Sequence, residues 1–200
     1  ALAAQGKTPR YVGQHQQLLG LIAVADTIKE TSREAIALLH EMGLETIMLT
    51  GDNQLTAQAI ATQVGIDRVL SDVLPEDKAR EVKKLQEAGR HVAMVGDGIN
   101  DAPALAQANV SYAMGSGTDI ALESADIVLM EDLTRIPYSI RLSKKMRGII
   151  KQNIIFALSV IAVLIISNLF QSINLPLGVV GHEGSTILVI LNGLRLLYFK

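Results

Sequence analysis

The most restrictive feature of the sequence is a long stretch without charge. Residues 152–181 contain no Asp, Glu, Lys or Arg, although charged residues make up 19% of the 200-residue chain. Residues 154–170 are apolar apart from two serines and one asparagine, and a second apolar span follows at 177–197. A helix of about 20 apolar residues crosses a hydrocarbon core of ~30 Å. A buried hairpin of a soluble protein is the alternative, but uncharged length on this scale is typical of membrane segments, so we expect two transmembrane helices.

Positive charge flanks both spans at one end. The connection at 171–176 has no charged residue, whereas basic residues precede the first span and close the second: Arg141, Lys144, Lys145, Arg147 and Lys151, then Arg195 and Lys200. Loops rich in Lys and Arg stay on the cytosolic side of a membrane. The distribution predicts that the residues before about 150 and the C-terminus face the cytosol. We also expect one continuous helix from Thr134 or Pro137 into the membrane.

The N-terminal part alternates short apolar runs with segments of helical period. The runs expected as strands are 18–25, 45–50, 69–71, 91–95, 110–114 and 127–130, and the segments expected as helices are 31–42, 55–64, 75–88, 101–108 and 118–125. Such alternation predicts an α/β fold with a parallel sheet covered by helices on both faces. Ligands bind at the carboxyl ends of the strands in sheets of this kind. We expect a soluble domain at 1–140 and a two-helix transmembrane segment at 141–200.

Several residues have the chemistry of helix ends. Thr31 and Glu34 form the pattern of a capping box, and Pro75 suits the first turn of a helix. Glycines stand where three of the helices are expected to stop, namely Gly43, Gly65 and Gly89.

Composition excludes several classes of function. A formal net charge of -2, four Tyr, three Phe and no Trp leave neither a basic surplus nor stacking platforms for nucleic acid. The absence of Cys removes disulfides and thiolate metal sites from consideration. The chain begins at Ala1 without Met or a signal-peptide pattern, so we expect a fragment of a longer protein.

Residues 94–103, Met-Val-Gly-Asp-Gly-Ile-Asn-Asp-Ala-Pro, end an apolar run with two carboxylates on a glycine-flanked loop. Magnesium prefers carboxylate, phosphate and water oxygens, so Asp97 and Asp101 are candidates to share one Mg2+ beside a phosphoryl group. Gly96 and Gly98 allow the backbone to turn sharply and to approach the ligand closely. An ordinary acidic strand-to-helix turn is the alternative, which a run this specific disfavours.

Two further strand ends bear polar groups. Thr50 begins the run Thr-Gly-Asp-Asn, which offers a hydroxyl and backbone amides to phosphate oxygens or, alternatively, a capping turn formed by Asp52 or Asn53. Lys78 lies in the first turn of the next helix, where it is either a solvated lysine or a cation beside phosphate. Opposite charges about 4 Å apart attract by roughly 4 kcal/mol at an effective dielectric near 20. Together with the two carboxylates of the 94–103 loop, these groups predict a phosphate site.

The runs Thr-Gly-Asp-Asn, Pro-x-x-Lys and Gly-Asp-Gly-Ile-Asn-Asp-Ala-Pro, in this order, resemble the phosphorylation domain of a P-type cation-transporting ATPase. The resemblance covers nearly the whole chain. It implies a haloacid-dehalogenase-like Rossmann domain that uses ATP and Mg2+ in a pump of the plasma membrane. It further implies that Asp97 binds magnesium and that Thr50 and Lys78 hold the phosphoryl group.

The same resemblance implies roles for neighbouring residues. Asn100 and Asp101 would order the site, and Gly51 with Asp52 would face the nucleotide. Asp26 and Lys29 are similar to the ends of the family's Asp-x-x-Arg hinge segment. Lysine keeps the positive charge of arginine there, but it lacks the planar, two-pronged hydrogen bonding.

One element of the family pattern is missing. The family's nucleophile lies in Asp-Lys-Thr-Gly-Thr, and no such run occurs between Ala1 and Lys200. The covalent step needs an attacking carboxylate. We therefore expect the isolated chain to form no phosphoenzyme and to depend on the remaining N-terminal part of the pump as its partner.

The second apolar span contains His-Glu-Gly-Ser-Thr at 182–186. A carboxylate at membrane depth costs several kcal/mol unless it is paired, so His182 and Glu183 are candidates for a metal site, with Thr186 on the helical face of His182. Imidazole suits zinc, cobalt, nickel or copper. The alternative places the pair in the interfacial layer, bonded to headgroups or to a neighbouring helix. The run resembles the cobalt and zinc export group of heavy-metal P-type ATPases.

Together these features predict the C-terminal part of an ATP-driven heavy-metal export pump that uses an aspartyl-phosphate intermediate. Zinc or cobalt is the expected divalent ion, and the lipid bilayer is the expected surrounding. Two alternatives stay open. One is a membrane-tethered haloacid-dehalogenase-like phosphatase, which would need an Asp-x-Asp motif upstream, and the other is a non-catalytic, truncated regulatory subunit.

Overall fold

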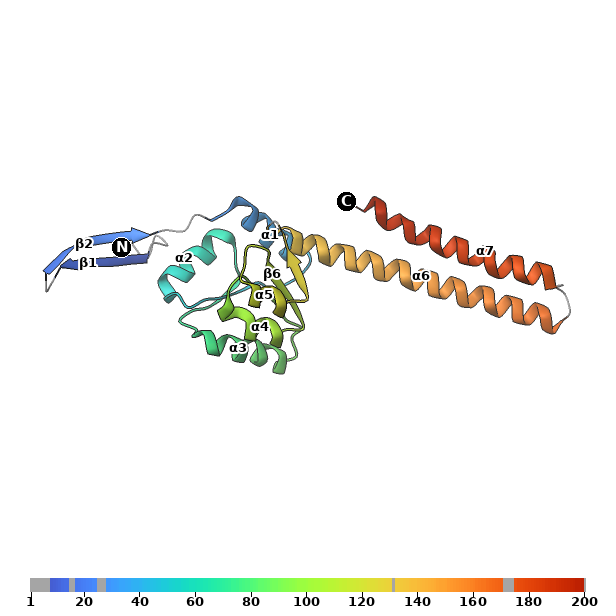
Figure 1. The fold of residues 1–200 in the computed structure, drawn as a ribbon, viewed down its shortest axis with the longest axis horizontal. Coiled ribbons are helices and arrows are strands. Elements are labelled where there is room, and N and C mark those ends of the chain that lie inside the picture. Colours follow the sequence, from blue (N-terminus) through green and yellow to red (C-terminus); the bar gives the residue numbers. More distant parts are fainter. Residues whose placement is uncertain (1–7, 15–16, 25–27, 131, 171–174, 200) are drawn as a thin grey trace. The chain divides into compact units, whose positions relative to one another are not determined.

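The computed structural model describes residues 8–14, 17–24, 28–130, 132–170 and 175–199. The chain divides into two compact units, Ala1–Pro137 and Tyr138–Lys200. The first contains a hairpin followed by an α/β fold, and the second contains a pair of long helices (Figure 1). The boundary at residue 140 that was expected between the soluble domain and the transmembrane segment stays a prediction.

The first two strands form an antiparallel hairpin. Strand β1 (Thr8–Gln14) pairs with β2 (Gln17–Val24), and the register shifts between Val12 and Gly13. The expectation that residues 18–25 join the parallel sheet was wrong, and no strand was expected at β1. The physical reason is the connection of two residues, 15 and 16, because a parallel return needs a crossover of a dozen residues or more.

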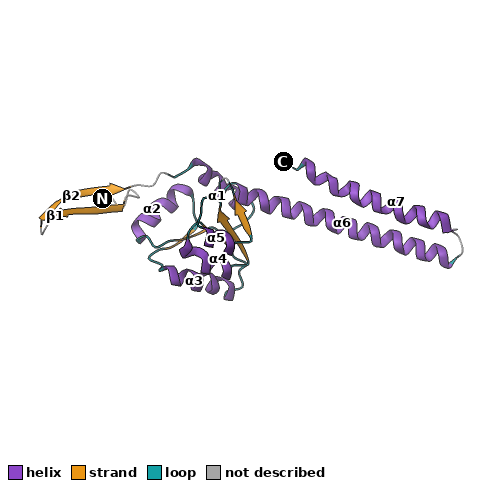
Figure 2. Ribbon diagram, in the orientation of Figure 1, coloured by secondary structure: helices purple, strands orange, loops and turns teal. Residues whose placement is uncertain are grey.

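The remaining strands, orange like the hairpin in Figure 2, pair in parallel. Strand β3 (Ile47–Leu49) pairs with β4 (Arg68–Leu70), and a second group has the order β5 (Ala93–Gly96), β6 (Val110–Met114) and β7 (Ile127–Leu129). These five strands confirm the parallel α/β fold that was expected for 45–130. Within the described ranges the parallel strands form two separate groups rather than one continuous sheet.

Five helices connect or follow these strands, and all five were expected. They are α1 (Glu30–Glu41), α2 (Gln54–Val64), α3 (Pro75–Glu87), α4 (Ala102–Gln107) and α5 (Asp119–Ser124). The three glycines expected at helix ends have φ angles of 73°, 84° and 80°, in the left-handed region that favours glycine. Pro75 occupies the first turn of α3, as expected.

The capping box expected at Thr31 is not formed. Helix α1 begins at Glu30, so Thr31 lies inside the first turn, and Lys29 occupies the cap position without a side-chain hydrogen bond. The capping turn that was the alternative for the start of α2 is formed by Asn53. Its side chain accepts a hydrogen bond from the backbone N–H of Thr56.

A small buried core holds helices α3 and α4 against the parallel strands. Val82 of α3, Met94 of β5, and Ala104 with Leu105 of α4 form one cluster, and Leu49 at the end of β3 packs against it. This core packs α3, α4, β5 and the end of β3 around the same group of side chains. Their loops bear the polar groups expected at the phosphate site.

The second unit contains α6 (Arg135–Leu169), α7 (Leu175–Gly193) and a short 3-10 turn, η3 (Leu194–Tyr198). Helix α6 is long and apolar enough to cross a membrane, and among the described residues it is the one helix that meets this criterion. The continuous helix expected from residue 134 or 137 is confirmed. A second membrane span at α7 stays a prediction.

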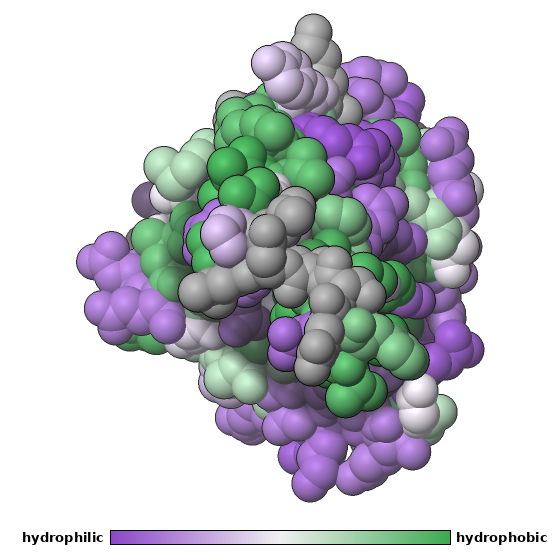
Figure 3. Space-filling model, turned by 90° about the vertical axis from the view of Figure 1, so that its right-hand side faces the viewer, coloured by the Kyte–Doolittle hydropathy of each residue, from purple (hydrophilic) through white to green (hydrophobic). Residues whose placement is uncertain are grey.

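The apolar side chains of this unit are exposed. Figure 3, viewed toward the connected end of the two helices, shows hydrophobic surface around that end. On α6, for example, Leu158, Ile165 and Leu169 are 62%, 63% and 78% exposed. Exposed apolar surface on this scale marks an interaction surface, and a lipid environment would cover it.

Polar groups join the two long helices near their other ends. Asn192 donates from Nδ2 to Oδ1 of Asn153 at 2.8 Å, and Asn153 donates to the carbonyl of Val189 at 3.3 Å. Asn192 and Asn153 therefore link the two helices through their side chains. Near the connection, a methyl group of Leu164 lies 3.4 Å from the position of a Cβ at Gly181, so the helices approach closely there.

Candidate active site

The best-defined polar contact of the α/β unit joins α3 to the loop after β5. Nζ of Lys78 lies 2.6 Å from Oδ1 of Asp101, and the two side chains are only 16% and 12% exposed. Pro75 starts α3 and places Lys78 in its first turn, while Asp101 ends the short 3-10 turn η2 (Ile99–Asp101). The surface-lysine alternative for Lys78 is therefore wrong, because this ammonium is largely buried in an ion pair.

The loop after β5 wraps around the second oxygen of Asp101. The backbone N–H groups of Asp97 and Gly98 both lie 3.4 Å from Oδ2, and the N–H of Asp101 donates to the carbonyl of Gly98. A Cβ at Gly96 would lie 2.6 Å from Cβ of Asp101, so only glycine allows this close approach. Asp101 thus holds its own loop in place while it pairs with Lys78.

The carboxylate of Asp97, unlike that of Asp101, is available to a ligand. Asp97 is exposed, and its carboxylate has no hydrogen bond or ion pair with any residue that the structure describes. Asn100 beside it is also exposed. The structure therefore brings together four of the expected site residues, Lys78, Asp97, Gly98 and Asp101, with one carboxylate committed to lysine and one free to bind a ligand.

The loop after β6 completes the surroundings of Asp97, although none of its residues was expected at the site. The N–H of Thr118 donates to the carbonyl of Asp97 at 3.0 Å. A Cβ at Gly117 would lie 2.6 Å from that same carbonyl oxygen and 2.8 Å from the carbonyl of Met114. The signal was present in the sequence, since Gly115 and Gly117 directly follow an expected strand.

Thr50 lies at the carboxyl end of β3 in a turn of its own. Its hydroxyl donates to Oδ2 of Asp52 and accepts from the backbone N–H of Asp52, both at 3.1 Å. Gly51 and Asp52 are exposed. In the described part of the chain, no hydrogen bond links Thr50 to Lys78 or Asp101, and Leu49, the residue before Thr50, packs against the core cluster that contains Val82 of α3. Their convergence on one phosphate stays a prediction.

The hinge segment is described only at one end. Asp26 lies outside the described residues, and Lys29 is exposed. The Thr134 hydroxyl and N–H lower the pKa of Asp132 below its ordinary value of 3.8, and the charges of Arg135 and Lys29 lower it further. Lys29 is thus close enough to Asp132, just before α6, to act on it electrostatically.

The candidate metal ligands of the second unit lie midway along α7. His182 and Glu183 are exposed, and the Thr186 hydroxyl donates to the carbonyl of His182 at 3.3 Å. No group of three or more acidic, histidine or cysteine side chains lies close enough to hold a metal among the described residues.

The oxygen donors after β5 fit magnesium. A hard cation of this kind is bound through one or two carboxylates, waters and the phosphate oxygens of a substrate. The free carboxylate of Asp97, with Asp101 adjacent to it, is such a donor set. The two protein carboxylates alone supply too few ligands for magnesium, which agrees with a site that is completed by phosphate and water.

Comparison with known proteins identifies the family. Residues 1–109 match the haloacid dehalogenase-like hydrolase model. The chain is 54% identical over 193 residues to a zinc-transporting ATPase of Bacillus subtilis, covering 96% of this chain and 30% of that protein. It is 48% identical to a cadmium-transporting ATPase of Staphylococcus aureus, covering 100% of this chain and 28% of that protein. The chain thus spans less than a third of the length of these curated relatives.

A solved structure agrees over both units. A zinc-transporting PIB-type ATPase in its E2.Pi state aligns with a TM-score of 0.86 and 41% identity, covering 98% of this chain and 32% of that one. The resemblance to heavy-metal P-type ATPases that the motifs indicated is confirmed. The chain belongs to the haloacid dehalogenase-like hydrolase family, and its relatives in that family are heavy-metal-transporting P-type ATPases.

Proposed function

We propose that this chain is the C-terminal part of an ATP-driven heavy-metal export pump that cycles through an aspartyl phosphate. The observation that supports this most is the buried ion pair of Lys78 and Asp101 beside the free carboxylate of Asp97. The same polypeptide continues into a helix long enough to span a membrane. The relatives described above, which are named for zinc and cadmium transport, favour a pump over a membrane-tethered phosphatase or a regulatory subunit.

Each site residue has a role that follows from its chemistry. The Lys78 ammonium neutralises phosphate charge, and its pairing with Asp101 fixes its position before phosphate arrives. Asp97 would hold magnesium directly, and Asp101, which is paired with Lys78, would hold the loop of Asp97 in place. Magnesium when bound neutralises charge on the phosphate oxygens. The Thr50 hydroxyl and neighbouring amides donate to phosphate, and Gly51 and Asp52 face ATP. Asn100 orders the site, and Gly98 faces the phosphate.

The attacking carboxylate comes from a part of the pump outside this sequence. Lys78 can position a phosphoryl group but cannot accept it covalently, because an ammonium is not a nucleophile for this step. The isolated chain is therefore expected to retain no label from gamma-labelled ATP after an acid quench. Acid-stable label on the purified 200-residue chain would contradict this part of the proposal.

The transported ion binds at His182, Glu183 and Thr186 together with ligands from other helices. Their position midway along α7 supports a site at membrane depth rather than in the interfacial layer. Zinc is favoured over cobalt, since the relatives described above are named for zinc and cadmium. Imidazole and carboxylate together suit such borderline cations.

The membrane arrangement completes the proposal. Helices α6 and α7 both cross the plasma membrane, so the α/β unit and the C-terminus share the cytosolic side. ATP hydrolysis by the α/β unit then takes place on the cytosolic side, where α6 begins. Helix α6 continues from the first unit into the second without a break.

The test is zinc-stimulated ATP hydrolysis by the intact protein that contains this chain. Purified protein in lipid nanodiscs should hydrolyse ATP faster with zinc than without it, and should show an acid-stable phosphoenzyme that Lys78→Ala abolishes. Hydrolysis of small phosphate esters without metal stimulation would instead favour the phosphatase. A protein without turnover that still binds magnesium and phosphate would favour the regulatory subunit.

A further inference from the structure

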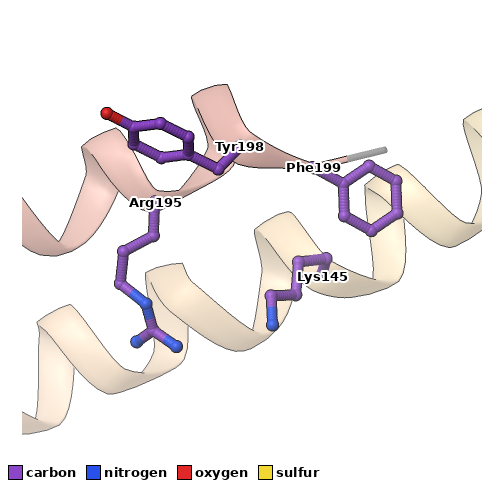
Figure 4. A pocket seen from close by; sticks show the side chains of 4 residues that line it. All are labelled: Lys145, Arg195, Tyr198 and Phe199. Atoms are coloured by element: carbon purple, nitrogen blue, oxygen red, sulfur yellow. The ribbon is translucent and has the colours of Figure 1, made fainter.

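A basic hollow lies where α6 and η3 meet in the second unit. It has a volume of about 330 Å³ and is lined by Lys145, Arg195, Tyr198 and Phe199. Figure 4 shows the side chains of Lys145, from α6, and Arg195, from η3, extending toward the same side. The hollow thus presents two cations from different helices toward one region of solvent.

Hydrogen bonds and ring packing hold this hollow in shape. Nη1 of Arg195 donates to Oδ1 of Asn192 at 2.9 Å, and Asn192 in turn bonds to Asn153 of α6. The Phe199 ring packs on Tyr138, with ring centroids 5.7 Å apart. Arg195 is therefore oriented by a chain of side chains that spans both helices, and most of its N–H groups stay available.

The charge of this unit is almost entirely positive. Glu183 is its single acidic residue, and six basic side chains lie in its described part, namely Arg141, Lys144, Lys145, Arg147, Lys151 and Arg195. None of the six forms an ion pair with a described carboxylate. A second hollow of about 490 Å³ on α6 is lined by three of these basic groups, by Gly148, and by Ile150, Ile154 and Ile155.

We propose that Lys145 and Arg195 bind the phosphate of an anionic phospholipid headgroup at the cytosolic face of the membrane. The inference rests on the membrane arrangement proposed above, which puts both residues at headgroup level. The guanidinium binds phosphate oxygens in pairs, and the ammonium adds a second point of charge. Clusters of Lys and Arg at the cytosolic end of a membrane helix attract anionic lipids.

The surroundings favour a lipid over free phosphate. Tyr198 is 87% exposed and adjoins the hollow, as aromatic side chains do at membrane interfaces. The lining of the second hollow begins on α6 with Lys144 and Arg147 and ends with Ile154 and Ile155, and a phospholipid likewise presents its headgroup at one end and its acyl chains at the other. A small soluble anion would use only the basic end of this surface.

The experiment measures lipid retained by the intact protein that contains this chain. The protein is purified in micelles with equal amounts of phosphatidylglycerol and phosphatidylcholine, and its bound lipids are identified by native mass spectrometry. Wild type should retain phosphatidylglycerol preferentially. Lys145→Gln and Arg195→Gln should each reduce this retention roughly fivefold, and the double variant should show the product of the two effects.

Two controls separate charge from structure. Arg195→Lys keeps the charge and should retain more lipid than Arg195→Gln, while Lys83→Gln removes a 63% exposed cation from α3 and should behave as wild type. Equal retention by wild type and the double variant, or no preference for phosphatidylglycerol, would overturn the inference. Displacement of the lipid by millimolar inorganic phosphate would overturn the choice of lipid.

Failure of this inference and failure of the proposed pump are distinguishable. Zinc-stimulated hydrolysis in phosphatidylcholine alone, without preferential lipid retention, would leave the pump intact and remove the lipid site. Preferential retention of phosphatidylglycerol by a protein without zinc-stimulated hydrolysis would support the lipid site and contradict the proposed pump.

Discussion

Asp67 and Asp126 occupy equivalent positions at the amino ends of two parallel strand pairs. Asp67 precedes β4, and its Oδ2 accepts from the N–H and hydroxyl of Thr46 at 2.7 and 2.9 Å. Asp126 precedes β7, and its Oδ2 accepts from the N–H and hydroxyl of Ser111, both at 2.8 Å. In each case the hydroxyl also accepts from the backbone N–H of the aspartate. These contacts join neighbouring strands at the edge opposite the candidate site.

The two carboxylates should make stability depend on acid pH. The backbone N–H and hydroxyl of Thr46 lower the pKa of Asp67, and the hydroxyl and N–H of Ser111 lower that of Asp126, from the ordinary value of 3.8. A lowered folded-state pKa means that the unfolded state takes up protons first as pH falls. The contribution to stability is therefore full at neutral pH and is lost as pH falls below about 3.8 through the folded-state pKa values.

The variant Asp126→Asn should test this directly. Its unfolding temperature should lie below that of wild type at pH 7, and the difference should shrink as pH approaches 3, because wild type then loses the same contribution. Thermal unfolding of the whole chain in detergent, followed by circular dichroism, measures this. Glu41→Gln removes an exposed carboxylate that has no partner in the described part, and should show no such trend. A pH-independent difference for Asp126→Asn would contradict the assignment.

The ion pair of Lys78 should stabilise the fold far more than a surface pair of the same length. Lys78→Met leaves the buried Asp101 without its cation and should cost about 3 kcal/mol of unfolding free energy. Lys84 on the same helix lies 2.6 Å from Glu81, but its side chain is 59% exposed, so Lys84→Met should cost less than about 1 kcal/mol. Hydrogen exchange of the α3 amides compares the two variants, and equal protection in both would contradict the expectation.

Part of this site was predictable from sequence because it is local. Asp97 and Asp101 lie in one loop, and the turn that joins them needs Gly96, so a short motif contains most of the geometry. Helix ends at left-handed glycines were predictable for the same reason. The role of Lys78 was predictable only from the order of the strands, because Lys78 and Asp101 are 23 residues apart in sequence. Only the motifs taken together indicated that Lys78 belongs to the site.

The errors come from competition between local patterns and distant contacts. Residues 18–25 have the apolar pattern of a sheet strand, but the two-residue connection at 15–16 gives them a neighbour, β1, that the pattern does not reveal. Thr31 has the sequence of a capping box, yet α1 begins one residue earlier. The distance between Thr50 and Lys78 depends on how two strand groups are arranged, which no local rule specifies.

Gly117 should tolerate no side chain. In Gly117→Ala the new Cβ would meet the carbonyl oxygens of Asp97 and Met114 at 2.6 and 2.8 Å, and backbone atoms cannot move away without shifting the site loop. We expect a loss of about 1–3 kcal/mol of unfolding free energy and a large loss of phosphoenzyme in the intact protein. For stability, Gly98→Ala is the control, because its nearest atom would lie 3.8 Å away. Wild-type stability of Gly117→Ala would show that the loop has room.

His182 and Glu183 should determine metal stimulation without affecting the phosphate site. In the intact protein, His182→Ala or Glu183→Ala should abolish zinc-stimulated ATP hydrolysis, because each removes a ligand from the proposed ion site. Phosphorylation by inorganic phosphate should persist in both variants, since that reaction uses the α/β unit. Ser185→Ala is the matched control, because the Ser185 hydroxyl is already engaged with the carbonyl of His182 at 2.7 Å. Unchanged zinc stimulation in both ligand variants would exclude this part of α7 from the transport site, and loss in Ser185→Ala would indicate a helix-packing effect instead.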